Sequence, residues 1–149
     1  MRALVQRVSS GAVNIPQKAY RQEIGKGMVI LLGVSEDDNV AEVKYVANKC
    51  CSLRIFNDDA DKMNLSVKDI NGEILIISQF TLYGDTRKGN RPSYNKAASP
   101  QKARDLYNVF VNLVKANVGE EKVKEGIFAA MMEVKIINDG PVTVLVESK

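Results

Sequence analysis

The sequence predicts a single α+β domain, in which two helices accompany a largely antiparallel sheet. A length of 149 residues is enough for one domain with a buried core. Several short strand-like segments follow one another through turns, while two stretches have the apolar periodicity of a helix. A parallel sheet would need more crossover helices than these two. No repeat, low-complexity tract or linker divides the chain, so we expect one domain over residues 1–149.

The first part of the chain is predicted to form strands. Side chains alternate between two faces from Arg2 to Ser9, and Gly11 separates this segment from the next. A Gly-Lys-Gly turn at 25–27 precedes the continuous apolar run from Met28 to Val34, which indicates a strand buried on both faces. In chain order, the strands expected here cover residues 2–9, 12–15, 20–24 and 28–34.

Each predicted helix has a recognisable start and an apolar face. The polar residues 35–38 suit an N-cap, and Val40, Val43, Ala47 and Cys50 then share one helical face. Ser99 and Pro100 combine an N-cap with proline at the first helical position, and Gly119 is suited to end this second helix. The apolar face of the second helix consists of Ala103, Leu106, Tyr107, Phe110, Leu113 and Val114.

The remaining segments are predicted to be a polar irregular stretch and three strands. Residues 54–66 are polar, and residues 73–80 form a second buried strand whose end is polar. Residues 133–137 alternate as in a half-buried strand, residues 138–141 read as a turn, and residues 142–147 form the last strand.

Composition excludes several kinds of enzyme. There is no histidine, which removes Ser-His-Asp and Cys-His hydrolysis and imidazole general bases. Cys50 and Cys51 are adjacent, so they suit neither a CxxC motif nor a four-ligand zinc site, and we expect them to be reduced in a helix. Phosphate-loop and dinucleotide motifs are missing, so we expect no cofactor and no metal. Without a signal-like or membrane-length apolar run, a cytoplasmic protein is expected.

Positive charge is concentrated in one segment. The net charge is +3, yet residues 84–104 contain one acid, Asp85, and six basic residues. Two interpretations remain open: a site for an anionic partner, or a solvated loop and helix start. The basic residues of this segment are Arg87, Lys88, Arg91, Lys96, Lys102 and Arg104.

Two short segments have the polar or backbone features of a binding site. Ser78, Gln79 and Thr81 lie at the end of a buried strand, where polar groups need partners: they either serve a function or bond the neighbouring backbone. Asn-Asp-Gly-Pro-Val-Thr at 138–143 reads locally as a turn. Its Gly140–Pro141 bond can be cis at modest cost, and two main-chain oxygens could then face one cationic group.

These segments, with others in the same order, resemble the D-aminoacyl-tRNA (D-tyrosyl-tRNA) deacylase family. The resemblance covers essentially the whole chain, and its strength comes from the ordered set rather than from any one motif. The matching segments are ALVQRV at 3–8, GVSEDD at 33–38, KMNLS at 62–66, SQFTLY at 78–83, RPSY with its flanking basic residues at 87–96, and NDGPVT at 138–143.

The resemblance implies a homodimer of curved, barrel-like sheets and an enzyme of translation quality control that hydrolyses the ester of D-aminoacyl-tRNA. Gly140 and Pro141 would form a Gly-cisPro chiral filter that enters the partner's active site, where their carbonyls hold the substrate ammonium group and exclude an L side chain. The pocket itself would be lined by Ser78, Gln79, Phe80 and Thr81, whose backbone supports the oxyanion.

Further residues have candidate roles at this site. Phe128 is a candidate wall for the terminal adenine, although it could simply be core, and Met131 stands where the family often has an acid. Arg7 shares a strand face with Ala3 and Val5, so it either reaches solvent at an edge or hydrogen-bonds the Gly140–Pro141 loop. Arg87, Lys88 and Arg91 are expected to bind tRNA phosphates.

Hydrolysis without histidine needs another source of catalytic groups. The resemblance suggests that the 2′-hydroxyl of the terminal ribose assists, while the protein supplies orientation and electrostatics. Thr81 is the alternative nucleophile, but the motif gives it no base. A non-catalytic RNA-binding module is the competing class of function. Glycine mischarged on tRNA(Ala) is a second expected substrate, because a filter that rejects L side chains cannot reject a missing one.

Overall fold

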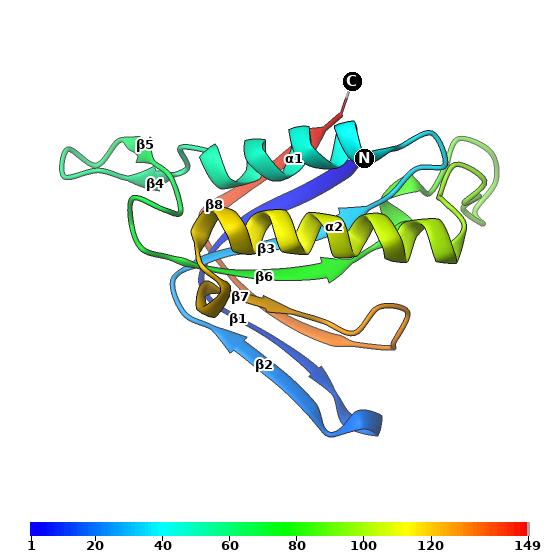
Figure 1. Ribbon diagram of the computed structural model, residues 1–149, viewed down its shortest axis with the longest axis horizontal. Coiled ribbons are helices and arrows are strands. Elements are labelled where there is room, and N and C mark those ends of the chain that lie inside the picture. The colour runs from blue at the N-terminus through cyan, green and yellow to red at the C-terminus, as the bar shows by residue number, and fades with distance from the viewer. Residues whose placement is uncertain (149) are drawn as a thin grey trace.

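A six-stranded sheet with two helices on one face forms the body of the protein (Figure 1). The computed structural model describes residues 1–148, so Lys149 of the predicted domain lies outside the described residues. The α+β class with two main helices is confirmed. The strands are β1 (Arg2–Ile15), β2 (Tyr20–Ile24), β3 (Gly27–Gly33), β6 (Glu73–Ser78), β7 (Val123–Glu125) and β8 (Glu133–Glu147), and the helices are α1 (Val40–Ser52) and α2 (Pro100–Val118).

The sheet is mixed, and its two helices are the connections that its parallel part requires. The strand order is β2-β1-β3-β6-β7, and β8 pairs with the other edge of β1. β1 is antiparallel to β2, β3 and β8, whereas the β3–β6 and β6–β7 pairs are parallel. A parallel pair needs a crossover, and α1 and α2 supply the two crossovers. A small hairpin of β4 (Phe56–Asn57) and β5 (Met63–Leu65) lies within the segment predicted to be irregular.

β1 is one long bent strand rather than the two predicted strands. Residues 2–8 pair with β3 and residues 11–15 pair with β2, so the strand bends where it changes partner (Figure 1). Gly11 does not end the strand but permits a close contact, because a Cβ there would lie 2.9 Å from Cγ2 of Val29. β8 follows the bend on the other edge, with two register shifts near its centre.

Residues 138–141 are likewise not a turn between two strands. Both sides of this segment pair with β1 in the same antiparallel sense, as Asn138 with Val8 and Thr143 with Gln6. The chain therefore does not reverse its pairing direction here; it bulges out of the β1–β8 ladder and returns to it.

The two faces of the sheet bury separate apolar cores. Val5, Ile30 and Ile76 face α1 and α2, which pack side by side over the sheet. Val13 and Leu75 lie in the second core, on the concave face. Tyr20 Oη donates to the Glu125 carbonyl at 2.7 Å, which links β2 to β7, the two ends of the strand order. This link gives the sheet its nearly closed, barrel-like shape.

α1 begins one residue later than the polar stretch that was expected to cap it. Asn39 is the N-cap: its side chain accepts from the Ala41 N–H at 2.8 Å, and Glu42 completes the capping box. Val40 is consequently in the first turn and 44% exposed, contrary to the predicted apolar face, whereas Val43, Ala47 and Cys50 are buried. Cys50 and Cys51 are both free thiols, and burial raises the pKa of the Cys51 thiol to about 11. No helix within residues 1–148 is long and apolar enough to cross a membrane.

Candidate functional site

The polar segment after β6 leaves the strand at Ser78 and turns. Ser78 is the last residue paired with β3, opposite Leu32, and the Gln79 N–H donates to the Leu32 carbonyl at 2.7 Å. A short 3₁₀ helix, η2 (Phe80–Tyr83), follows directly. The strand alternation expected through Phe80 is therefore wrong, because the strand ends two residues earlier. The turn instead presents the exposed Phe80 and Thr81 beside the strand end.

A pocket of about 540 Å³ opens at this strand end, between η2, the start of α2 and the segment after β7. Ser78, Gln79, Phe80 and Phe128, all predicted site residues, line it, whereas Thr81 lies next to it. None of the residues that line the pocket within the described part of the chain carries a charge. The other lining residues are Leu32, Val34, Ile77, Ala97, Ala98, Pro100, Ala103, Tyr107, Ala129, Ala130, Met131, Met132 and Val134.

The polar groups at the mouth of the pocket offer hydrogen bonds but no base. Gln79 Nε2 donates to Thr81 Oγ1 at 2.5 Å. An amide nitrogen cannot accept the threonine proton, so this contact orients the hydroxyl without activating it. Beside it, the Phe80 ring packs edge-on against Tyr94, with centroids 5.0 Å apart.

Aromatic and thioether groups form the opposite wall. Phe128 is half-buried and packs against the Tyr107 ring at 5.9 Å, and the Arg104 guanidinium lies 5.1 Å from the Phe128 centroid. Tyr107 Oη donates to the Ile76 carbonyl at 3.0 Å, and burial raises the pKa of this phenol. Met131 stands 81% exposed at the rim. Sequence reasoning did not assign Tyr107 to the site, because its helical spacing indicated only a core position.

The bulge at 139–142 presents main-chain groups that the sheet does not use. Asn138 and Thr143, on either side of the bulge, both pair with β1, whereas the four residues between them lie outside the ladder. The Gly140–Pro141 bond is cis, as the sequence predicted, and both residues are exposed. The Asn138 side chain closes the bulge: its Oδ1 accepts from the Val142 N–H at 3.0 Å, and its Nδ2 donates to Thr143 Oγ1 at 2.9 Å.

Arg7 stands opposite this bulge and holds it in place. Its Nε donates to the Asp139 carbonyl at 3.0 Å, and its Nη1 donates to the Ile55 carbonyl at 2.8 Å and to Asn57 Oδ1 at 3.1 Å. The side chain is only 11% exposed, so it does not reach out to solvent at an edge. Of the two interpretations of Arg7, the geometry agrees with hydrogen bonding to the Gly140–Pro141 loop.

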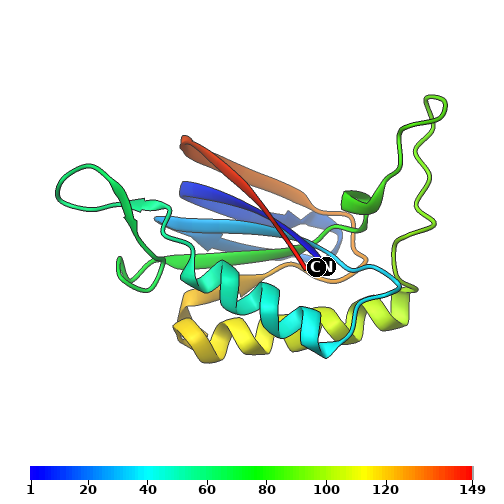
Figure 2. The same cartoon turned by 90° about the horizontal axis from the view of Figure 1, so that it is seen from above.

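Within one chain, the bulge and the pocket lie at different places on the sheet. Arg7 is level with Met28, which pairs with Ile74, four residues before Ser78 on β6. The bulge on β8 is therefore separated from the pocket by about 13 Å along the strand direction. Across the sheet the two are three strand spacings apart, which is about 14 Å. Figure 2 shows the outer bend of β8 and the green η2 turn on opposite sides of the molecule.

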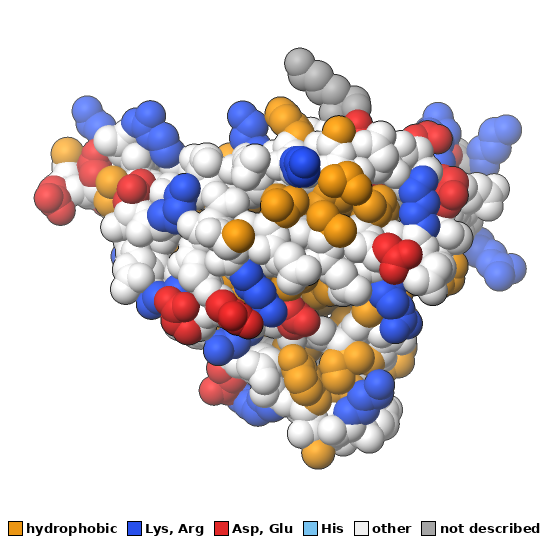
Figure 3. Space-filling view, in the orientation of Figure 1, with side chains coloured by type: hydrophobic (Ala, Val, Ile, Leu, Met, Phe, Trp, Pro, Cys, Tyr) orange, Lys and Arg blue, Asp and Glu red, His pale blue; other side chains and the backbone are white. Residues whose placement is uncertain are grey.

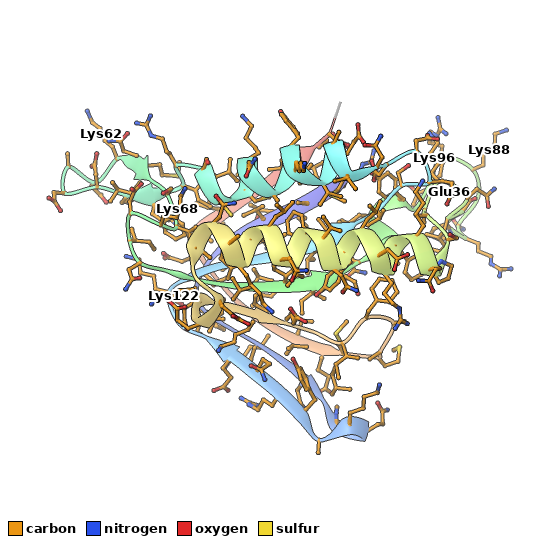
Figure 4. All side chains as sticks on the ribbon, in the orientation of Figure 1. Glu36, Lys62, Lys68, Lys88, Lys96 and Lys122 are labelled. Carbon is orange, nitrogen blue, oxygen red and sulfur yellow. The ribbon has the colours of Figure 1, made fainter. Side chains whose placement is uncertain are left out.

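The basic segment, residues 84–104, lies at the pocket end. Positive side chains gather there in Figure 3, and Figure 4 labels Lys88 and Lys96 among them. The main chains of Asp85 and Ser93 exchange two hydrogen bonds, which close a loop that contains the exposed Arg87, Lys88 and Arg91. Arg87 Nε contacts both Asp85 carboxylate oxygens, at 2.9 and 3.1 Å, and these hydrogen bonds lower the pKa of Asp85.

Replacing Gly140 with alanine should distort the bulge. Gly140 has φ +127°, and an added Cβ would lie 2.8 Å from Arg7 Nη2, so both the backbone and the Arg7 contact oppose a side chain there. We expect Gly140→Ala to lower the free energy of unfolding by about 1–3 kcal/mol, measured by chemical denaturation. Gly89→Ala is the matched control, because Gly89 also has positive φ but nothing lies within 4 Å of its added Cβ. Equal losses of unfolding free energy in the two variants would show that the contact with Arg7 does not contribute to the effect.

Comparison with known proteins agrees with the motifs. Residues 4–147 match a family model described as D-Tyr-tRNA(Tyr) deacylase. A protein of Fervidobacterium nodosum (strain ATCC 35602 / DSM 5306 / Rt17-B1) named D-aminoacyl-tRNA deacylase is 54% identical over 149 residues, which is 100% of this chain and 98% of that protein.

Two solved structures have the same fold. One, titled "c-Myc DNA Unwinding Element Binding Protein", has a TM-score of 0.94 and 38% sequence identity and covers 100% of this chain and 99% of its own. The other, titled "Structural Analysis of a probable eukaryotic D-amino acid tRNA deacylase", has a TM-score of 0.83 at 17% identity, covering 99% and 98%, and shows the fold alone. Because both the family model and the relative from Fervidobacterium nodosum match nearly the whole length, the chain belongs to the D-aminoacyl-tRNA deacylase family.

Proposed function

We propose that the protein hydrolyses the ester bond of D-aminoacyl-tRNA and releases the free D-amino acid and tRNA. Family membership makes it a D-aminoacyl-tRNA deacylase, an ester hydrolase. The observation that carries the mechanism is the uncharged pocket at the end of β6, where Ser78, Gln79 and Phe80 lie at a turn. Because this reaction protects translation from D-amino acids, the proposal places the protein in the cytoplasm.

The pocket suits a reaction in which the substrate supplies the proton-transfer group. Ester hydrolysis needs a positioned water, donors for the oxyanion and a route for protons. The first residues of η2 have main-chain N–H groups without partners inside that helix, which are suitable oxyanion donors. Since Thr81 has an amide donor beside it rather than a base, the terminal ribose 2′-hydroxyl is the better candidate to assist the attack.

The pocket wall suits the terminal adenosine. The apolar wall includes the aromatic ring of Phe128, which can stack a nucleobase, and Arg104 over that ring can add a cation–π contact or bind a phosphate. The polar strand end at Ser78 and Gln79 then lies where the ribose and the ester would be.

Chiral selection is assigned to the Gly140–Pro141 bulge of a partner subunit. When the carbonyl and the ammonium group of an amino acid are both fixed, exchanging D for L only exchanges the hydrogen and the side chain. A main-chain wall that leaves no space for the L side chain rejects every L-amino acid regardless of its identity. Because bulge and pocket are far apart within one chain, a homodimer is the arrangement that can bring them together.

A second substrate and the RNA contacts are also part of the proposal. Glycine on tRNA(Ala) has no side chain to exclude, so it is a second proposed substrate. The basic segment beside the pocket, with Arg87, Lys88 and Arg91 exposed, is proposed to bind tRNA phosphates.

A non-catalytic RNA-binding module is the alternative function, since the basic segment would serve either. One structural relative is titled "c-Myc DNA Unwinding Element Binding Protein". Release of the amino acid from D-Tyr-, L-Tyr- and Gly-tRNA distinguishes the two. The deacylase proposal predicts fast release of D-Tyr and Gly with L-Tyr left intact. Binding of all three without release would support the module instead.

Mixing two defective variants tests whether each site needs both subunits. Phe80→Pro removes a main-chain N–H at the first position of η2. The preceding Gln79 has φ −145° and ψ 82°, which is outside the α region that a following proline disfavours. When Phe80→Pro chains are mixed with Gly140→Ala chains, each heterodimer has one complete site, made of the intact pocket of the Gly140→Ala chain and the intact bulge of the Phe80→Pro chain. About half of the dimers are heterodimers, so D-Tyr release should recover to roughly a quarter of the wild-type rate. Each variant alone should stay defective.

The matched control is a chain that carries both changes, mixed with the wild type. If sites form across the interface, these heterodimers contain no complete site, and only the wild-type homodimers are active. If each chain builds its own site, the heterodimers keep one site, and the first mixture shows no recovery.

Thr81→Ala should reduce kcat by less than about 100-fold, because the hydroxyl is proposed to orient groups and not to attack. Loss of a true nucleophile costs on the order of 10⁶-fold. Single-turnover release of D-Tyr measures the difference, with tRNA binding and unfolding as checks on integrity. A trapped acyl group on Thr81 would contradict substrate assistance.

Replacing Arg87, Lys88 and Arg91 together with alanine should weaken binding to every charged tRNA. Each lost phosphate contact should flatten the log–log slope of affinity against salt by about 0.7. Filter binding or anisotropy over a salt series provides the slope. The matched control removes three exposed lysines elsewhere, Lys44, Lys49 and Lys68, and should change the slope little. Equal effects in the two triple variants would assign the change to net charge alone.

A further inference from the structure

Arg2 connects the turn after β6 to the rest of the sheet. Its Nη1 donates to the Leu82 carbonyl at 2.8 Å, and its guanidinium carbon lies 4.7 Å from the centroid of the Tyr83 ring. On its other side, Nε donates to Glu147 Oε1 at 2.7 Å. One side chain at the start of β1 therefore holds two residues of η2 and the end of β8 at the same time.

η2 has few other restraints. It contains no buried residue, and no side chain caps its start. On the main chain, the Gln79 N–H is bonded to Leu32, and the turn lies directly on Gly33, where a Cβ would be 3.1 Å from both the Gln79 carbonyl oxygen and Leu82 Cβ. These contacts hold the turn against β3, and Arg2 adds a hydrogen bond and a ring contact at its end.

We propose that Arg2 is a positioning residue for the deacylation reaction: its guanidinium sets the orientation of η2, and through it the main-chain N–H groups and side chains of Phe80 and Thr81. The inference rests on the proposed function, which puts the reacting ester at this turn. Arg2 itself does not line the pocket.

The geometry requires arginine rather than any cation. A planar guanidinium can donate to a carbonyl and to a carboxylate through separate N–H groups while its face stacks on a ring. A lysine ammonium is a compact charge on a flexible stem and cannot hold the three groups in one fixed plane. Arg2→Lys therefore keeps the charge and removes the orientation.

Three variants separate positioning from general stability. Arg2→Lys should lower kcat for D-Tyr release about 10- to 100-fold with KM nearly unchanged, because a displaced turn weakens transition-state contacts more than binding. Glu147→Gln removes the outer ion pair and leaves the contacts to Leu82 and Tyr83, so kcat should change little although the unfolding midpoint shifts. Arg21→Lys alters another exposed ion pair, the one with Glu23, and is the control for changing an arginine.

The outcomes are distinct. A larger loss of kcat in Arg2→Lys than in Glu147→Gln, measured at a temperature where both variants are folded, supports positioning. Full kcat in Arg2→Lys, or equal losses in the two variants, overturns it and leaves Arg2 a structural residue. Failure of the proposed function would be recognised separately, since the wild type would then not release D-Tyr or Phe80→Pro would leave the rate unchanged.

Discussion

The long antiparallel pairing of β1 with β8, and the mismatch within it, is the constraint on which the rest of the structure depends. Between the pairs Gln6–Thr143 and Val8–Asn138, one residue of β1 faces four residues of β8. The surplus main chain has to leave the ladder, and Arg7 is the single residue opposite it. An arginine at that place satisfies the Asp139 carbonyl and also ties the bulge to Asn57 of β4 and to Ile55 directly before it. The bulge is thereby held by a charge-assisted hydrogen bond instead of by sheet pairing.

The other half of the proposed site depends on the parallel strands. β3 and β6 end side by side, and the chain must turn away there, so main-chain N–H groups and the side chains of Ser78 and Gln79 meet at a common edge. The crossover helix α2 and the segment after β7 return to the same edge and supply the apolar walls, Tyr107 and Phe128 among them. A pocket with an uncharged lining can place an ester accurately, but it relies on main-chain dipoles and on the substrate for its chemistry.

The sequence predicted the class of fold, both helices and most strand positions, because periodicity reports which face of an element is buried. The predicted strand break at Gly11 and the predicted turn at residues 138–141 were wrong for the same physical reason. In a local sequence pattern, glycine, asparagine and proline indicate the end of a strand. β1 and β8 nevertheless continue through these residues, because each pairs with the other along its length, and this long-range pairing leaves no local signal. The prediction for Val40 was wrong because Val40 is the first residue of α1, directly after the Asn39 cap, where the helix end leaves its side chain exposed. The site motifs were visible as an ordered set, whereas the contact between Arg2 and Leu82 joins residues 80 positions apart and leaves no local pattern.

Placing the two halves of the proposed site on different parts of one sheet has a consequence for specificity. A bulge that is exposed at its tip and supported from behind by Arg7 can enter a second molecule without changing its own shape. In a two-fold dimer the same contact would be made twice, so that the bulge of each subunit would complete the pocket of the other. Recognition by main-chain atoms would also make the proposed filter insensitive to which side chain the substrate carries, and that is the property that a single enzyme needs to remove many different D-amino acids. Under the proposed mechanism, side-chain changes around the pocket would adjust the fit to tRNA, while the choice between D and L would stay with the backbone of Gly140 and Pro141.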